Sequence, residues 1–538
     1  MARTPLLRYF SALARQHDAA EHMGISPAEW RERRAAAALN RRRFLQGSAA
    51  AAAIAMMPKP VRAAGTTPRI AVIGAGISSL NAALTLQDKG IAATVYEASG
   101  YIGGRMKSET SGYWDNGQNS EIYGELIDTN HTSILGLAQR FGLPVDDLNA
   151  ADPPGATETY YFYGKRVSAA QIDDDFVAVR AACKKDITAA GYPTLWNKFK
   201  PAGQALDRLS VYDWIQSRVP GGTGSAMGKL LDIAYTEEYG GDTTDQSSLN
   251  LLYLLGYQPA PKGFSIFGVS DERYHIRGGN QKLPQAIAAS LPDVRLGWRM
   301  TAVRQNTGGT VTLTFDAPSG IQLVTVDRVI VTAPFAVLRN LDIAGAGFDA
   351  LKLRAIKELG AGRNAKLLLQ FNSRLWNSSG PWGISNGSSY TDLGYQNTWD
   401  TTRGQPGATG IIVGYSGGST AAAFTPLTPY STAAQNPQVG TYARSFLKQF
   451  DTVFPGVQKL WNGKATLSVA HRNAQFNCSY SYFRVGQYTT FGGYEGVPQG
   501  AIHFAGEHCS QDYQGYMEGG AREGARAGLE VFHALTGN

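Results

Sequence analysis

The clearest hydrophobic pattern in the chain is the stretch RIAVIGAGISSL, residues 69–80. Its first half is a continuous apolar run, which is typical of a strand buried on both faces. Two glycines follow at once, and residues 77–90 then place apolar side chains at helical spacing and end in glycine. Residues 91–98 are a second, shorter apolar run. The pattern predicts a strand, a tight turn, a helix and a second strand.

This order of elements is that of a dinucleotide-binding Rossmann unit. Gly74 would make the tight turn, and Gly76 would let the backbone approach a pyrophosphate at the positive end of the helix. Glu97 ends the second strand, where an acid accepts hydrogen bonds from ribose hydroxyls. Ser79 replaces the third glycine of the fingerprint, but that position sets helix–strand packing and tolerates a small side chain. The acid argues against NADP and leaves NAD and FAD open.

A second candidate for chemistry lies in NAKLLLQFNSRLW, residues 364–376. Its alternating apolar residues predict a strand, on which Lys366 either points into a cavity or is solvated. Two further glycine-rich stretches, residues 345–350 and 360–365, follow no uninterrupted strand and are predicted to be loops. Without a second Rossmann unit, a reductase that takes electrons from NAD(P)H is not expected.

Four more segments follow the first unit in a recognisable order: EASGYIGGRMKSE (97–109), GGNQKLPQAIAASL (278–291), DRVIVTAPFAVL (327–338) and IHFAGEHCSQDYQGYMEGGAREGARAG (502–528). Together they closely resemble the flavin-containing amine oxidase family, which includes monoamine, polyamine and L-amino-acid oxidases. The resemblance covers most of residues 68–535 and is weakest across about 150–270. It implies FAD, with the C-terminal segment folded back onto the first Rossmann unit.

The resemblance assigns residues to two parts of the site. Those implied to bind FAD are Gly74, Gly76, Ser79, Glu97, Gly104, Arg105, Val303, Glu507 and Met517. Within this set, residues 299–303 match the stretch whose backbone contacts adenine. Those implied at the reacting centre are Lys366, which would hold a water near flavin N5, and Tyr480 and Tyr516, the two walls of an aromatic cage for the substrate. No metal site is expected.

Two positions depart from patterns within the family. Glu125 stands where venom-type L-amino-acid oxidases carry an arginine that binds the substrate carboxylate. Either the substrate has no carboxylate or another arginine binds it. Glu125 would then contact a second ammonium or a polar flavin edge, or form a structural salt bridge. Ser479 aligns with the cysteine that tethers FAD in some monoamine oxidases, although an alignment on Gly486 would place Cys478 there. Non-covalent FAD is therefore expected.

The resemblance predicts an FAD-dependent oxidase of a primary amine or an L-amino acid. Hydride would leave the carbon alpha to nitrogen for flavin N5. The imine would hydrolyse to an aldehyde or keto acid plus ammonia, and molecular oxygen would become hydrogen peroxide. Two alternatives stay open: a dehydrogenase of the same fold that uses another electron acceptor, and an exported flavoprotein without turnover of a small molecule.

The expected fold class combines α/β and α+β parts in two intertwined domains. A discontinuous Rossmann-type FAD-binding domain would take residues 66–125, 272–345 and 490–535. A substrate-binding domain would take residues 126–271 and 346–489, with helices at 210–215 and 230–242. The sequence leaves the oligomeric state open, a homodimer included.

The net charge of +7 does not indicate a nucleic-acid partner, because it resides near the N-terminus. Residues 1–63 hold 11 of the 50 Lys and Arg but 4 of the 43 Asp and Glu, so the rest of the chain is balanced. In NRRRFLQGSAAAAAIAMMPKPVRAAG (40–65), arginines precede a short apolar run and a small-residue site. This resembles a twin-arginine signal and predicts recognition by that export machinery, with a periplasmic or secreted protein. The three cysteines are too far apart in the sequence to predict a metal site or a disulfide framework.

Overall fold

The computed structural model describes residues 68–256 and 264–537. The leader predicted at residues 1–63 lies outside the described residues, so export stays a prediction. No helix in the described part of the chain has the length and apolar character of a membrane span.

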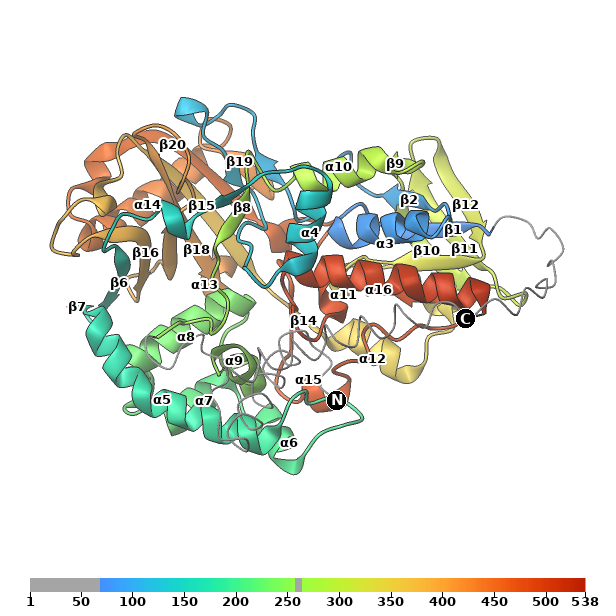
Figure 1. The fold of residues 1–538 in the computed structure, drawn as a ribbon, viewed down its shortest axis with the longest axis horizontal. Helices are drawn as coiled ribbons and strands as arrows, with labels where there is room; N and C mark the ends of the chain where they lie inside the picture. Colours follow the sequence, from blue (N-terminus) through green and yellow to red (C-terminus); the bar gives the residue numbers. More distant parts are fainter. Residues whose placement is uncertain (1–67, 257–263, 538) are drawn as a thin grey trace, which may run out of the picture. The chain divides into compact units, whose positions relative to one another are not determined.

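A parallel sheet with helices on one face forms the first part of the fold (Figure 1). Its strands, in spatial order, are β22 (Ile502–Phe504), β13 (Arg328–Val331), β1 (Ile70–Ile73), β2 (Thr94–Glu97) and β9 (Val294–Leu296). Helices α3 (Ile77–Asp88) and α16 (Met517–Thr536) lie side by side and pack with apolar residues of one sheet face. The predicted return of the C-terminal segment to the first Rossmann unit is thereby confirmed.

The other face of the parallel sheet is covered by an antiparallel sheet of three strands. These strands are β10 (Arg299–Gln305), β11 (Val311–Ala317) and β12 (Gly320–Val326). The alternation of side chains along β1 explains the two-sided packing: Val72 contacts the helix cluster, whereas Ala71 and Ile73 contact the antiparallel sheet. Both faces of β1 are therefore buried, as its continuous apolar run predicts.

An eight-stranded mixed sheet forms the second part. Its strands, in spatial order, are β19 (Tyr430–Thr432), β20 (Trp461–Val469), β15 (Asn364–Phe371), β18 (Gly410–Gly417), β17 (Asn397–Asp400), β16 (Ser385–Thr391), β6 (Thr157–Phe162) and β7 (Lys165–Val167). Helix α14 (Pro437–Val453) packs with apolar residues of this sheet. Helices in the green part of Figure 1 form a separate layer with their own apolar core. They are α5 (Ala169–Ala190), α6 (Pro201–Asp207), α7 (Val211–Arg218), α8 (Ala226–Tyr239) and α9 (Ser248–Leu255).

Short elements connect these layers. The strands are β3 (Ser108–Glu109), β4 (Ser120–Glu121), β5 (Val145–Asp147), β8 (Tyr274–Ile276), β14 (Gly360–Ala361) and β21 (Ser481–Tyr482). The helices are α4 (Thr132–Arg140), α10 (Lys282–Ser290), α11 (Phe335–Leu338), α12 (Ala350–Glu358), α13 (Gly418–Ala422) and α15 (Gln487–Thr490). The predicted strand with Lys366 is β15, and the helices predicted at 210–215 and 230–242 are α7 and α8.

Candidate active site

A cavity of about 720 Å³ extends from the parallel sheet to the eight-stranded sheet. Gly74 and Glu97, which follow and end strands β1 and β2, line it on one side. Lys366 on β15 and Tyr415 on β18 line it on the other. The cavity therefore joins the predicted nucleotide site to the predicted reacting centre.

The turn after β1 leaves space beside the first amides of α3. Gly74 has φ +107°, and a Cβ there would lie 2.8 Å from Thr332 Oγ1. Gly76 has an ordinary φ of −80° and is the N-cap of α3, which has no side-chain cap. A Cβ on Gly76 would meet only Gly103 O, at 3.9 Å, within 4 Å. A methyl group on Gly76 would thus enter space beside the uncapped amides of α3, which suits an anion.

The serine in place of the third glycine is a packing residue. Ser79 is fully buried, does not line the cavity, and its Oγ lies 2.6 Å from Thr332 Oγ1. Thr332 donates its own hydroxyl proton to Ile73 O at 2.7 Å, so Ser79 is the donor of the pair. The serine hydroxyl therefore ties α3 to the end of β13 without leaving a buried polar group unpaired.

Glu97 fixes the same turn from the second strand. Its Oε2 accepts from the backbone N–H of Ala75 at 2.7 Å, and its Oε1 accepts from Ser99 N–H at 2.7 Å. The carboxylate is buried at the cavity wall. Gln514 also lines the cavity, with a buried Nε2 that has no partner among the described residues. A ligand with an acceptor at that point would satisfy this donor.

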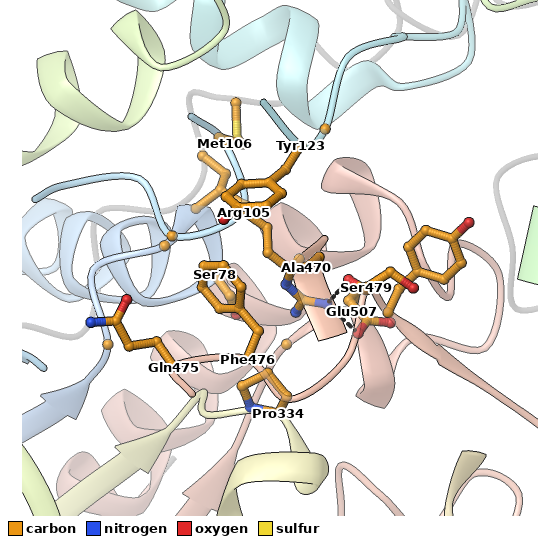
Figure 2. A pocket seen from close by; sticks show the side chains of 18 of the residues that line it. Ser78, Arg105, Met106, Tyr123, Pro334, Ala470, Gln475, Phe476, Ser479 and Glu507 are labelled. Carbon is orange, nitrogen blue, oxygen red and sulfur yellow. Dashed lines mark hydrogen bonds and ion pairs between the residues drawn. The ribbon is translucent and has the colours of Figure 1, made fainter. Parts of the chain in front are cut away.

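An ion pair crosses the middle of the cavity wall (Figure 2). Arg105 Nη1 lies 2.9 Å from Glu507 Oε1 and donates to Ser479 O at 2.8 Å. Glu507 also accepts from Ser481 Oγ and from the N–H of Gly515. Burial opposes the charged form of Glu507, but Arg105 outweighs it and holds the pKa of this carboxyl below its usual range. The pair stays charged and joins three segments that are distant in sequence.

Lys366 and Glu125 form a second buried ion pair. They are 5% and 8% exposed, and Lys366 Nζ lies 2.5 Å from Glu125 Oε2. Nζ also donates to Tyr123 O at 3.1 Å and Glu121 O at 3.3 Å, so three protein acceptors match its three donors. Burial opposes the charge on Glu125, but Lys366 and the Trp399 N–H hold the pKa of this carboxyl below its usual range. Of the contacts expected for Glu125, the structure therefore shows the structural salt bridge, and its partner is Lys366.

The family resemblance implies that Lys366 holds a water. In this structure, protein acceptors already bind the three N–H donors of the lysine. What the ammonium supplies is a fixed positive charge at the cavity wall. Trp399, whose ring centroid lies 5.6 Å from Nζ, lines the cavity beside it.

The two cage tyrosines both line the cavity, and each is held through its hydroxyl. Tyr480 donates to Glu237 O at 3.1 Å and lies 2.9 Å from the hydroxyl of Tyr415. Tyr516 donates to Glu238 Oε1 at 2.7 Å. A Cβ on Gly515, which precedes Tyr516, would lie 3.6 Å from the Tyr480 ring, so the two segments are in contact. The rings are fixed rather than free to rotate into the cavity.

Most of the predicted site residues line the cavity together: Gly74, Gly76, Glu97, Gly104, Arg105, Glu125, Lys366, Tyr480, Glu507, Tyr516 and Met517. Val303 does not. It is buried between the sheets and its N–H donates to Asp342 O, whereas Met300, before a register shift in β10, lines the cavity. Cys478 is buried and absent from the lining, whereas Ser479 is part of it.

Several lining residues were not predicted from the sequence. Glu238 lies at the end of the predicted helix α8, but no periodicity distinguishes a cavity residue from a core residue there. Glu272 lies in a loop with φ 44°, and Trp399 on β17 belongs to a strand that was not predicted. The acidic pair GluGlu in the apolar helix segment was the one signal available for Glu238.

A family model for flavin-containing amine oxidoreductase matches residues 77–531, which include all of the cavity residues just described except Gly74 and Gly76. The chain belongs to this family. It is therefore a flavin-dependent oxidoreductase, and the resemblance seen in the sequence is confirmed.

Relatives and solved structures of this family agree with the assignment. The L-amino-acid oxidase of Vipera ammodytes ammodytes is 22% identical over 499 residues, which cover 86% of this chain and 93% of the relative. The fold is that of cyclohexylamine oxidase from Brevibacterium oxydans IH-35A, with a TM-score of 0.73 at 21% identity over 88% of this chain and 100% of that chain. Putrescine oxidase bound to putrescine gives a TM-score of 0.71 at 18% identity over 86% and 99%.

Proposed function

We propose that the protein is an FAD-dependent oxidase of small primary amines, in which non-covalent FAD occupies the cavity. The supporting observation is continuity: one cavity contains the Gly74–Gly76 turn, the Arg105–Glu507 pair, Lys366 and the two tyrosines. The exclusion of Cys478 from the lining supports non-covalent binding, because the buried thiol does not reach the cavity surface.

FAD, when bound, supplies the hydride acceptor and passes its electrons to oxygen. The chain's own residues would do three things. The N-terminus of α3 and Glu97 would hold the phosphates and ribose. Tyr480 and Tyr516 would confine the substrate so that its alpha C–H has one orientation. Lys366 would keep a positive charge near the reacting atoms, paired with Glu125. The balanced reaction is amine plus oxygen plus water to aldehyde, ammonia and hydrogen peroxide.

An amine is favoured over an amino acid by the charges in the cavity. Glu125, at the position where an arginine would bind a carboxylate, is anionic and bonded to Lys366. A substrate carboxylate near Glu125 would be repelled.

Anaerobic mixing with monoamines, diamines and L-amino acids tests the proposal. We expect amines to bleach the flavin absorbance, and admission of air to restore it with one hydrogen peroxide per turnover. Bleaching by amines without rapid reoxidation in air would identify a dehydrogenase. A fully loaded flavin that no amine reduces would refute the proposed function, and reduction by L-amino acids alone would identify an amino-acid oxidase.

A further inference from the structure

The cavity contains more acidic side chains than the protein pairs with cations. Three cationic side chains line it among the described residues: Arg105, Arg299 and Lys366. Each already has a carboxylate partner, which is Glu507, Asp316 or Glu125, respectively. In the described part of the lining, no arginine or lysine is therefore left to bind a substrate anion.

Three lining carboxylates have no cationic partner within the described residues: Glu97, Glu238 and Glu272. Glu97 is bound by the backbone N–H groups of Ala75 and Ser99, which leaves Glu238 and Glu272. Glu238 is half-buried near the end of α8, and its contact is the hydroxyl of Tyr516 at 2.7 Å. Glu272 is half-buried two residues before β8, and its backbone N–H donates to Asp128 Oδ1 at 2.9 Å. No described group donates a hydrogen bond to the carboxylate of Glu272. Both acids thus line the cavity, and Glu238 adjoins Tyr516, one predicted wall of the aromatic cage.

Glu238 and Glu272 are close enough to influence each other. Burial, and then the charge of Glu238, raise the pKa of Glu272 well above its usual range. Burial likewise raises the pKa of Glu238 to about 7. Neighbouring carboxylates that lack a cation are costly to ionise, and a bound cation would relieve that cost.

The rings around these acids also suit a cation. Tyr239, Tyr415, Tyr516 and Trp399 line the same cavity. Aromatic faces attract ammonium groups and add to the attraction of a carboxylate. The combination of anionic and aromatic groups would repel a carboxylate-bearing side chain.

We propose that Glu238 and Glu272 bind a second cationic group of the substrate, so that the preferred substrates are α,ω-diamines. The proposal rests on the proposed function and names its substrate class. The reacting nitrogen must be neutral to lose hydride from its neighbouring carbon, whereas the distal nitrogen stays protonated. The two acids would select for that distal ammonium and set the position of the chain between the tyrosines.

The test compares diamines of three to six carbons with monoamines of the same chain length, by anaerobic flavin reduction. We expect the limiting rate of reduction divided by the apparent Kd to favour the best diamine over its matched monoamine by a ratio of about ten or more, the effect of one charge-assisted hydrogen bond. Glu272→Gln should reduce this ratio by about ten-fold, and Glu272→Asp should retain part of it. The matched control is Glu358→Gln, an exposed carboxylate paired with Arg354 at the end of α12, which should leave the ratio as in the wild type.

A second measurement needs no turnover. Calorimetry with 1,4-bis(trimethylammonio)butane and with butyltrimethylammonium compares a dication and a monocation that cannot be oxidised. The dication should bind more tightly to the wild-type holoenzyme, and Glu272→Gln should remove most of the difference.

Several outcomes would overturn the inference. Monoamines that reduce the flavin as efficiently as diamines would do so and leave the proposed function intact. L-amino acids that reduce it as efficiently would overturn the inference and also the preference for amines in the proposed function. Equal affinity for the two quaternary probes, or an equal loss for both substrates in Glu272→Gln, would also overturn it. A loaded flavin that no amine reduces would remove the proposed function, and the inference with it.

Discussion

At the scale of single residues, a double-mutant cycle on Lys366 and Glu125 tests how much stability comes from their charge pairing. Removal of one partner leaves the other charge buried, which costs about 3 kcal/mol of unfolding free energy. Lys366→Met and Glu125→Gln should each show this loss, but the double variant should be more stable than the sum predicts. Amine oxidation should stay impaired in all three. Urea unfolding gives the stability cycle, and oxygen uptake gives the activity. Additive stability losses would show that the pair is not coupled.

Substitution by alanine should lower the stability of the protein at Gly74 but the flavin content at Gly76. Gly74→Ala puts a side chain at φ +107° and 2.8 Å from Thr332 Oγ1, so it should lower the stability of the apoprotein. Gly76→Ala has an acceptable φ and open space, so the apoprotein should be nearly as stable as the wild type. Its methyl group would occupy cofactor space, and flavin content should fall. Apoprotein Tm and the ratio of flavin to protein absorbance measure the two effects. Equal flavin content in Gly76→Ala would place the pyrophosphate elsewhere.

At the scale of elements, the contact between α3 and α16 depends on a glycine. A Cβ at Gly524 of α16 would lie 2.1 Å from Ser78 O on α3, where only a shift of one helix could relieve it. Gly524→Ala should therefore lower the unfolding free energy by about 2 kcal/mol, through overpacking. The control is Gly136→Ala within α4, where nothing lies within 4 Å of the added methyl. It should gain up to about 1 kcal/mol from helix propensity. Denaturant unfolding of both variants measures the contrast, and similar stabilities would contradict close packing here.

The same scale shows which elements the sequence could predict. Strands β1 and β2 and helix α3 were located within three residues, because their signals are local: an apolar run, glycines and helical spacing. The order of the eight-stranded sheet was out of reach, because β6 pairs with β16 more than two hundred residues away. Cavity residues likewise could be predicted only where a local sequence pattern or a family motif marks them. For Lys366 the strand pattern left a cavity position and a solvated one open, and the family resemblance selected the cavity. Glu272 lies in a loop whose position only the tertiary fold determines.

At the scale of the whole molecule, distant segments meet at one cavity. Glu507 near the C-terminal end, Arg105 near the first Rossmann unit and Ser481 between them share hydrogen bonds. A defect in this cluster would therefore affect cofactor binding and the packing of the parallel sheet together. The boundaries predicted for the two domains stay predictions, although each strand of the parallel sheet falls within a range assigned to the FAD-binding part.

The stability of the whole molecule should also depend on pH through a buried imidazole. His508 is 1% exposed, neither ring nitrogen has a partner among the described residues, and burial lowers its pKa to about 4. The unfolded chain binds a proton at the ordinary pKa of about 6.5, so below that pH the unfolded state gains protons that the folded state does not. Between pH 7 and pH 5 this group should remove about 2 kcal/mol of stability.

His508→Leu tests this dependence, because Phe335 lies beside the imidazole at a centroid distance of 4.6 Å and an apolar side chain suits that site. The variant should be more stable relative to the wild type at pH 5 than at pH 7, by about the same 2 kcal/mol. Other groups titrate in this range in both proteins, so the difference between the two curves isolates His508. Guanidinium unfolding of the holoenzyme at both pH values gives that difference. Parallel curves for variant and wild type would mean that the folded state protonates His508 at its ordinary pKa, and that the site is open to water.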